Sequence, residues 1–130
     1  MLLVARSLFE TVRAEAARTH PNECCGLLLG TGDRIERAVP AGNVHPDSAR
    51  RFEIDPQALI DAHRAARAGG PDVIGYYHSH PTGAAAPSAE DRARAARDGS
   101  VWAIVAGGDV TFWRDDEGGF AALSYTVVGG

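Results

Sequence analysis

Two histidines separated by one residue close an apolar run near the middle of this 130-residue chain. Residues 73–77 read VIGYY, and His78 and His80 follow. Along an extended strand alternate side chains share a face, so these two imidazoles are expected to project together. Asp91 comes later, at the start of a predicted helix. The sequence therefore predicts a site with three metal ligands, two imidazoles from a strand end and one carboxylate from a helix start.

Asp91 also has an explanation that needs no metal. Ser88 and Asp91 form a Ser-x-x-Asp sequence directly after a proline, which is typical of a capping box at a helix N-terminus. The pair alone favours the cap, whereas the pair together with His78 and His80 favours the metal site. Two imidazoles and one carboxylate suit Zn²⁺ with a fourth position for water, although manganese, iron or cobalt can use similar ligands.

A metal site that activates water also needs a base, and Glu23 is the candidate. It is a charged residue at the head of a very apolar run, residues 24–29, which read CCGLLL. An exposed glutamate in a loop explains the same pattern equally well. Composition alone does not choose between the two interpretations.

Hydrophobic periodicity and turn residues predict a mixed α/β (α+β) fold, a central mixed sheet flanked by helices. Ser7 with Glu10 forms a capping-box pattern for the first helix, and Asp55-Pro56 supplies an N-cap and a first-turn proline for the second. The expected helices are 7–19, 55–68 and 88–98. The expected strands are 23–30 and 34–40, which form a hairpin, and 51–54, 72–78, 101–105, 110–113 and 120–128. Four aromatic residues of the last strands are expected in the sheet core: Trp102, Phe112, Trp113 and Tyr125.

Composition narrows the class of protein. The net charge is −4 and no face is obviously basic, which argues against nucleic acid as the main partner. No apolar run approaches the roughly 20 residues that cross a bilayer, so a cytoplasmic location is the default expectation. Cys24 and Cys25 are adjacent and are expected to be buried free thiols, because neighbouring cysteines bridge only with strain. The C-terminal stretch 127–130, which ends in two glycines, is expected to be a frayed end.

Taken together, Glu23, His78-Ser79-His80, Ser88 and Asp91 resemble the JAMM motif of the MPN (Mov34/PAD-1) metalloproteases. That motif reads glutamate, then His-Ser/Thr-His, seven residues, serine, two residues and aspartate, and every position and spacing is met here. Residues 51–56, RFEIDP, also look like the compact bacterial members, the sulfur-carrier (CysO-cysteine) peptidases. The resemblance implies one MPN/JAB-like, cytidine-deaminase-like domain over residues 1–130.

The resemblance also implies a role for each motif residue. His78, His80 and Asp91 would bind one Zn²⁺ per chain, with water as the fourth ligand. Glu23 would take a proton from that water and deliver one to the leaving amine. Ser88 would hydrogen-bond the oxyanion of the tetrahedral intermediate.

The implied function is zinc-dependent hydrolysis of a peptide or isopeptide bond. The bond would follow the Gly-Gly tail of a ubiquitin-like or sulfur-carrier protein, which is the expected partner. No nucleic-acid or membrane partner is expected, and the resemblance leaves room for a homodimer. The alternative is a catalytically silent MPN scaffold or interaction domain. Such relatives typically lose one or more ligands, whereas this chain keeps all of them.

Overall fold

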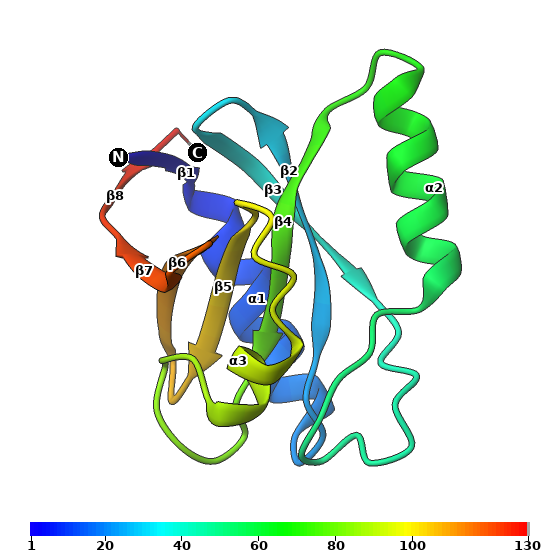
Figure 1. Ribbon diagram of the computed structural model, residues 1–130, viewed down its shortest axis with the longest axis vertical. Coiled ribbons are helices and arrows are strands. Elements are labelled where there is room, and N and C mark those ends of the chain that lie inside the picture. The colour runs from blue at the N-terminus through cyan, green and yellow to red at the C-terminus, as the bar shows by residue number, and fades with distance from the viewer. Residues whose placement is uncertain (130) are drawn as a thin grey trace.

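The computed structural model describes residues 1–129, so Gly130 of the glycine tail lies outside the described residues. Within them the chain forms eight strands and three helices (Figure 1). The helices are α1 (Arg6–Thr19), α2 (Pro56–Arg67) and α3 (Ala89–Arg94). The strands are β1 (Leu2–Ala5), β2 (Cys25–Thr31), β3 (Arg34–Ala41), β4 (Asp72–Ser79), β5 (Val101–Ala106), β6 (Asp109–Asp116), β7 (Gly119–Leu123) and β8 (Tyr125–Val128).

The strands form one mixed sheet in the order β7-β6-β5-β4-β2-β3-β1-β8. β4 runs parallel to β5, and β1 runs parallel to both β3 and β8, whereas the other neighbours are antiparallel. β7 and β8 lie at opposite edges of the sheet although only Ser124 separates them in sequence. The sheet therefore curls until its edges approach each other, and the Leu2 N–H donates to the Ser124 carbonyl at 3.1 Å (Figure 1).

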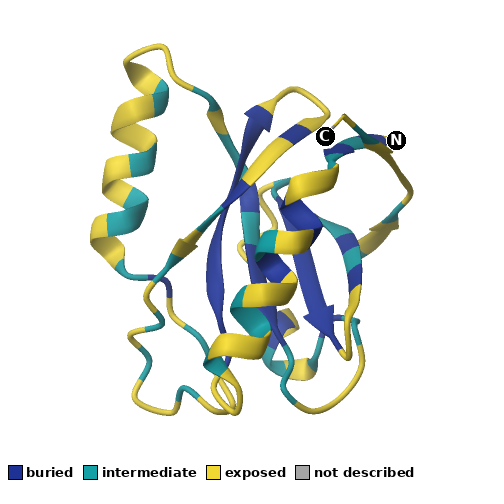
Figure 2. Ribbon diagram, turned by 180° about the vertical axis from the view of Figure 1, so that it is seen from behind, coloured by how far each residue is buried: buried dark blue, intermediate teal, exposed yellow. Residues whose placement is uncertain are grey.

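The core lies on both faces of this curled sheet. Leu8, Phe9 and Val12 on the inner side of α1 are buried in the larger hydrophobic cluster. A smaller cluster beneath α2 contains Leu27 and Ile54. Figure 2 shows that the central strands are buried while the helices expose their outer faces. α3 is only six residues long, and it lies at the end of β4 that carries the two histidines.

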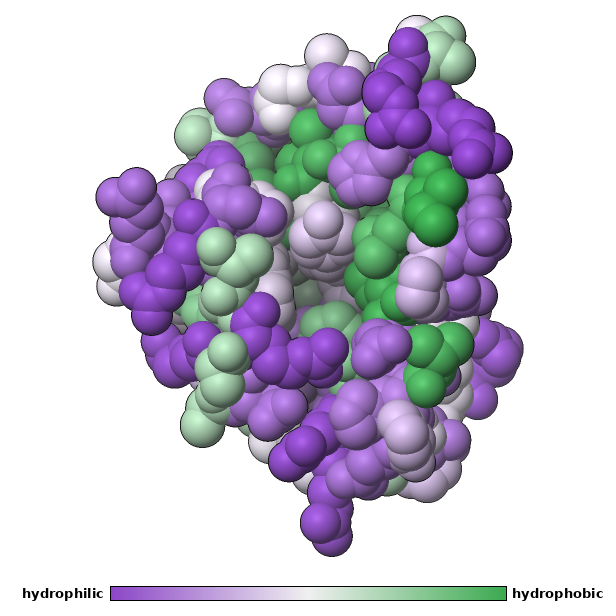
Figure 3. All heavy atoms as spheres, turned by 45° about the vertical axis from the view of Figure 1, so that its right-hand side comes forward, coloured by the Kyte–Doolittle hydropathy of each residue, from purple (hydrophilic) through white to green (hydrophobic). Residues whose placement is uncertain are grey.

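α2 stands out from the sheet, and none of its residues is fully buried. A cleft of about 290 Å³ on this side is lined by Phe52, Ile54, Leu59, Tyr76 and Trp102, among others. Figure 3 shows a hollow on the face that carries α2, with apolar side chains gathered along its rim. Exposed apolar surface next to a concavity is typical of a binding face.

Several local predictions are confirmed. β2 and β3 form the predicted hairpin. The Asp55 side chain caps α2 by accepting from the Gln57 N–H at 3.0 Å, and Pro56 is the first residue of that helix. Cys24 and Cys25 are buried free thiols. Among the described residues, no helix is both long enough and apolar enough to cross a bilayer.

The predicted start of the first helix is wrong. α1 begins at Arg6, its N-cap is Ala5 without a side-chain cap bond, and Ser7 lies exposed in the first turn. The cause is β1, a strand that the sequence analysis did not predict. β1 is held between β3 and β8, so the chain passes directly from a paired strand into the helix and leaves no place for a serine cap.

The third helix is shorter than predicted and ends at Arg94 rather than at residue 98. Arg97 adopts a left-handed conformation with φ 56°, and its N–H donates to a buried carboxylate oxygen of Asp115 at 3.0 Å. The main chain of Asp115 also pairs with Gly99 and Ser100. These contacts with β6 hold residues 97–100 in an irregular conformation that a continued helix would break.

Two predicted strands also differ. Residues 51–54 contribute only an isolated bridge between Asn43 and Ile54 instead of a strand. Residues 120–128 are extended but form two strands, because they pair with opposite edges of the sheet on either side of Ser124. Val127 and Val128 are therefore paired in β8 and not frayed. Tyr125, predicted in the core, is 38% exposed, although its ring still lies against Phe9 and Phe112.

Candidate active site

The three predicted ligands converge where β4 ends and α3 begins. The Nε2 atoms of His78 and His80 are 3.1 Å apart. Asp91 places Oδ1 3.0 Å from His78 Nε2 and Oδ2 3.1 Å from His80 Nε2. The period of two along β4 brings the imidazoles to one face, as the sequence predicted, and the first turn of α3 supplies the carboxylate.

This arrangement fits a tetrahedral metal. Ligands bonded to zinc at about 2.0–2.1 Å lie about 3.3 Å from one another, close to the separations seen here. The orientation of His80 also fits, because its Nδ1 lies 2.8 Å from the Ala84 carbonyl. An N–H on Nδ1 donates to that carbonyl and leaves the Nε2 lone pair facing Asp91 and His78. The donor set is therefore suited to one divalent ion.

Burial and charge favour the protonation states that a metal requires at His78 and Asp91, whereas at His80 they favour the proton. His78 is 1% exposed, and its burial lowers the imidazole pKa despite the neighbouring Asp91. Burial opposes ionisation of Asp91, but hydrogen bonds with His78 and His80 outweigh it and hold the Asp91 pKa well below its usual range. The same hydrogen bond to Asp91 raises the pKa of His80. Protons and a metal ion compete for His80, so metal binding is expected to weaken as the pH falls.

Aromatic side chains fix the ring of His78. The Phe52 ring stacks on it with centroids 4.4 Å apart and an interplanar angle of 18°. Trp102 meets the same imidazole edge-on, with a centroid distance of 5.6 Å and an angle of 89°. Phe52 is fastened in turn by Arg94 of α3, whose guanidinium lies 5.3 Å from the ring centroid and donates to the Phe52 carbonyl. The expected strand over residues 51–54 did not predict this contact.

The capping box and the ligand arrangement coexist. The Ser88 N–H donates to Asp91 Oδ2 at 2.9 Å, and the Asp91 N–H donates to Ser88 Oγ at 3.1 Å. The cap uses the Ser88 hydroxyl oxygen as an acceptor, so the hydroxyl hydrogen is not consumed by it. Both interpretations of the Ser-x-x-Asp sequence therefore describe the same side chains.

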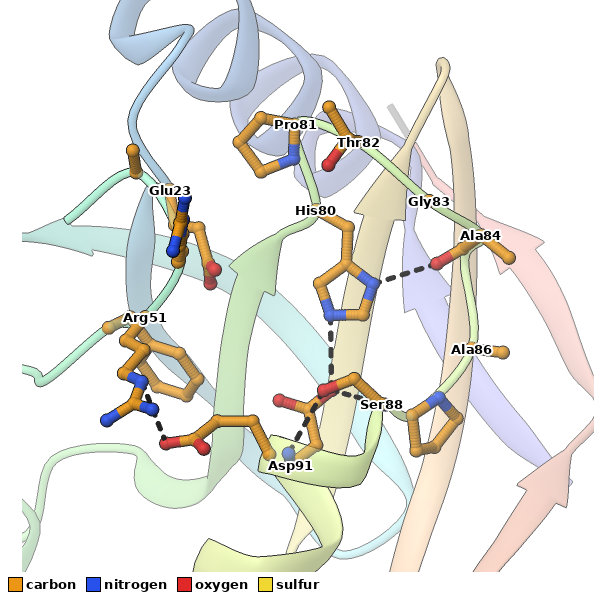
Figure 4. A pocket seen from close by; sticks show the side chains of 15 residues that line it. Glu23, Arg51, His80, Pro81, Thr82, Gly83, Ala84, Ala86, Ser88 and Asp91 are labelled. Atoms are coloured by element: carbon orange, nitrogen blue, oxygen red, sulfur yellow. Dashed lines mark hydrogen bonds and ion pairs between the residues drawn. The ribbon is translucent and has the colours of Figure 1, made fainter. Parts of the chain in front are cut away.

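Glu23 lies in the same pocket as this donor set. It occupies irregular backbone just before β2 and is 7% exposed, so the exposed-loop alternative is wrong. The pocket measures about 380 Å³ and is also lined by His80, Ser88 and Asp91. Figure 4 shows the Glu23 carboxyl group on the wall opposite Ser88, turned into the pocket. The next residue, Cys24, is joined to the end of β4, because the Cys24 N–H donates to Ser79 Oγ at 2.9 Å.

Burial raises the pKa of Glu23 to about 7. His80 and Arg94 partly offset this rise, whereas the carboxylates of Asp91 and Glu90 add to it. A carboxyl group with a pKa near neutrality can accept and return a proton at physiological pH. The pocket thus pairs a candidate metal site with a candidate general base.

The raised pKa predicts a pH-dependent stability of the metal-free protein. Because the folded-state pKa lies above the unfolded value, the contribution of Glu23 to stability is complete below pH 4.5 and is lost as the pH rises through 7. Glu23→Gln is therefore expected to stabilise the chelator-treated protein by about 3 kcal/mol at pH 8 and by about 1 kcal/mol or less at pH 5. Urea denaturation at both pH values measures this difference.

Glu36→Gln is the matched control, since Glu36 is an exposed glutamate on β3. Its effect should be small and equal at the two pH values. A Glu23→Gln protein that gains no more stability at pH 8 than at pH 5 would show that the carboxyl group is solvated in the folded protein.

The structure brings all five predicted site residues together around one pocket and its metal-ligand cluster. Sequence reasoning missed the role of the loop between β3 and α2, residues 42–55, which covers them and is called the covering loop below. Arg51 lines the pocket and pairs with Glu90 of α3 at 3.7 Å (Figure 4). Asn43 holds this loop to Glu23 through side-chain hydrogen bonds. Neither residue carries a local signal in the sequence, because each role depends on a contact distant in the chain.

A comparison with protein-family models matches residues 5–116 to Prok-JAB, described as prokaryotic homologs of the JAB domain. The chain belongs to the Prok-JAB family. The match covers the pocket residues and both elements that supply the donor set. The predicted resemblance to the JAMM/MPN group is confirmed at the level of the family.

Prok-JAB relatives with curated names share much of this chain. Desampylase of Haloferax volcanii is 36% identical over 93% of this chain and 89% of its own length. The probable TtuB-protein conjugate cleaving protease of Thermus thermophilus is 41% identical over 70% of this chain, and CysO-cysteine peptidase of Mycobacterium tuberculosis is 32% identical over 70%. These matches span only 61% and 63% of the latter two proteins. The relatives support the predicted hydrolase class.

Solved structures confirm the predicted fold. A protein from Desulfitobacterium hafniense matches with a TM-score of 0.87 and 28% identity, covering 100% of this chain and 94% of the other. A structure described as a JAMM metalloprotease-like zinc site in the proteasome and signalosome matches with a TM-score of 0.63 and 22% identity, covering 99% of both chains. The Prok-JAB chain thus has the mixed α/β fold that its sequence predicted.

Proposed function

We propose that this chain is a zinc-dependent hydrolase that cuts the peptide or isopeptide bond following the Gly-Gly tail of a ubiquitin-like or sulfur-carrier protein. One observation carries the proposal. Two imidazole nitrogens and a carboxylate converge at 3.0–3.1 Å beside a pocket whose opposite wall holds Glu23. This is the set of groups that metal-assisted hydrolysis requires.

His78, His80 and Asp91 would hold the zinc ion. A zinc ion supplies Lewis acidity, which lowers the pKa of water toward about 7 and polarises a carbonyl group. Glu23 accepts the proton of the attacking water and passes a proton to the leaving amine, a task suited to its pKa of about 7. Ser88 donates its hydroxyl hydrogen to the developing oxyanion, while its oxygen keeps accepting from the Asp91 N–H.

The pocket shape supports a glycine tail. Part of its wall is a loop of small residues that includes Gly83, Ala84 and Ala86. A tail without side chains can bring its carbonyl close to buried groups, whereas branched residues need more width. The apolar cleft beside α2 supports a protein substrate, because Phe52 lines both that cleft and the pocket.

The names of the relatives support the substrate class. Those of the Thermus and Mycobacterium proteins refer to the cleavage of a TtuB-protein conjugate and of CysO-cysteine. We extend this class to the present chain. The buried free thiols Cys24 and Cys25 support a reducing, cytoplasmic setting.

Cleavage assays with the zinc-loaded protein test the proposal. The substrates are a small ubiquitin-like carrier ending in Gly-Gly, joined either to a lysine side chain or to cysteine. The control is the same carrier ending in Val-Val. We expect the Gly-Gly adduct to be cut at least about a hundredfold faster, because valine side chains add bulk next to the pocket wall of small residues.

The competing hypothesis is the silent scaffold. It predicts that zinc binds without cleavage of any adduct, whereas the hydrolase predicts one zinc per chain together with turnover. Retention of all three ligands and of Glu23 favours the hydrolase. Zinc-loaded protein that leaves every carrier adduct intact would overturn the proposal.

A further inference from the structure

We propose that Asn43 is a positioning residue, whose side-chain amide holds the main chain of Glu23 and thereby sets where the Glu23 carboxyl group lies in the pocket. Its importance for catalysis rests on the proposed function, whereas the positioning itself does not. Asn43 follows β3 and is distant from Glu23 in sequence. The two residues meet only in the folded chain.

The sheet holds the residue after Glu23, since the Cys24 N–H donates to Ser79 Oγ of β4, but it does not hold the N–H and carbonyl of Glu23 itself. Glu23 precedes β2, so its peptide groups form no ladder with a neighbouring strand. The N–H and the carbonyl of Glu23 are instead hydrogen-bonded to residues of the covering loop. The Glu23 N–H donates to the Ser48 carbonyl at 2.7 Å, and the Glu23 carbonyl accepts from Asn43 Nδ2 at 3.0 Å. The position of the carboxyl group therefore depends on this loop as well as on the anchoring of Cys24 to β4.

The Asn43 amide uses its full hydrogen-bonding capacity. Nδ2 donates to the carbonyls of Glu23 and Arg51, each at 3.0 Å. Oδ1 accepts from the N–H groups of His45 and Glu53, each at 3.1 Å. A carboxamide has two donors and two acceptor positions, so all four are satisfied, and a carboxylate in its place could not donate. The four partners also fix which end of the amide is nitrogen.

The same side chain links the base to the opposite part of the site. By holding Arg51 and Glu53, Asn43 fixes the residue between them, Phe52, which stacks on His78. Asn43 is thus placed to fix the position of Glu23 relative to the ring of His78. Small displacements of a catalytic group, of about 1 Å, can cost about a hundredfold in rate.

A stability cycle on metal-free protein tests the positioning without any substrate. The four proteins are the parent, Asn43→Ala, Glu23→Gln and the double variant, compared by urea denaturation at pH 8. If Asn43 holds Glu23 in its buried place, Glu23→Gln raises the folding equilibrium constant about 300-fold in the parent, since the pKa of Glu23 rises from 4.5 to about 7 and each pKa unit is a factor of ten. In the Asn43→Ala background the gain should fall below about threefold, because the freed carboxyl group reaches water.

An equal gain in both backgrounds would overturn the inference, since a merely structural asparagine costs the same stability whichever residue occupies position 23. If Asn43→Ala does not fold, Asn43→Ser keeps one donor and one acceptor and repeats the cycle. This test can fail independently of the proposed function. The proposed function fails only if the parent protein cuts no carrier adduct.

Kinetics of the zinc-loaded protein give the second measurement. Asn43→Ala should lower kcat about 30- to 100-fold with KM changed less than about threefold and one zinc retained. His45→Ala is the control: it removes the acceptor of the Asp47 N–H at 2.9 Å but leaves the backbone N–H that reaches Asn43. Equal losses in kcat for the two variants would show that any loosening of the loop suffices and would refute a specific role for Asn43.

Discussion

Replacing Glu23 with glutamine is expected to lower the rate of carrier cleavage by at least about a hundredfold while one zinc ion stays bound per chain. Glutamine keeps the shape of the side chain but cannot accept a proton at neutral pH, and general acid–base catalysis contributes about 10²–10⁴-fold. Glu23 is not one of the three converging donors, so the metal site should survive. Single-turnover cleavage and metal analysis of the same preparation measure both effects.

Glu90→Gln is the matched control for this experiment. Glu90 also lines the pocket, but it is more exposed and pairs with Arg51. We expect it to change the rate by less than about tenfold, because an exposed ion pair contributes little. If Glu23→Gln and Glu90→Gln reduced the rate equally, the carboxylates would act through the charge of the pocket and not through proton transfer by Glu23.

The donor set could be predicted because its geometry is local. A strand of period two places His78 and His80 on one face, and a Ser-x-x-Asp sequence places Asp91 in the first turn of a helix. Both patterns extend over a few residues, and the structure reproduces them. Glu23 needed the resemblance to a known motif, because nothing in its own neighbourhood distinguishes a buried base from an exposed loop residue.

The parts that could not be predicted depend on contacts between distant segments. β1 carries too short an apolar pattern to be recognised, and it is stabilised by two strands that follow it at a distance in sequence, β3 and β8. Its formation overrides the Ser7 cap. Likewise α3 ends early because Asp115 of β6 binds the Arg97 N–H, although residues 95–98 have ordinary helical composition. Tertiary pairing outweighs local propensity in both cases.

The covering loop at the site also could not be predicted, because its fold depends on contacts between distant segments. In sequence, residues 41–50 form a polar loop, and residues 51–54 resemble a short strand. In the structure Asn43 bridges Ile54, and the segment between them folds over Glu23 and His78. The burial that raises the pKa of Glu23 is thus a property of the assembled loop, and no composition rule would have given it.

Asp91→Asn is expected to abolish both zinc binding and cleavage, and comparison with Ser88→Ala separates the two roles of the Ser-x-x-Asp sequence. An asparagine oxygen can still accept from the Ser88 N–H, so much of the cap is kept, but the ligand loses its negative charge. We expect zinc affinity to fall at least about a hundredfold. Dialysis against a competing chelator, followed by metal analysis, measures this loss.

Ser88→Ala should give the opposite pattern. It removes the acceptor of the Asp91 N–H and should cost about 1 kcal/mol of stability, while the three zinc ligands stay in place. Its rate should fall about 10²–10³-fold, because the oxyanion loses a donor. If Asp91→Asn kept one zinc per chain through the dialysis, the aspartate would serve only as a cap. Groups other than the Asp91 carboxylate would then hold the metal, and the convergence of side chains at the end of β4 would need another explanation.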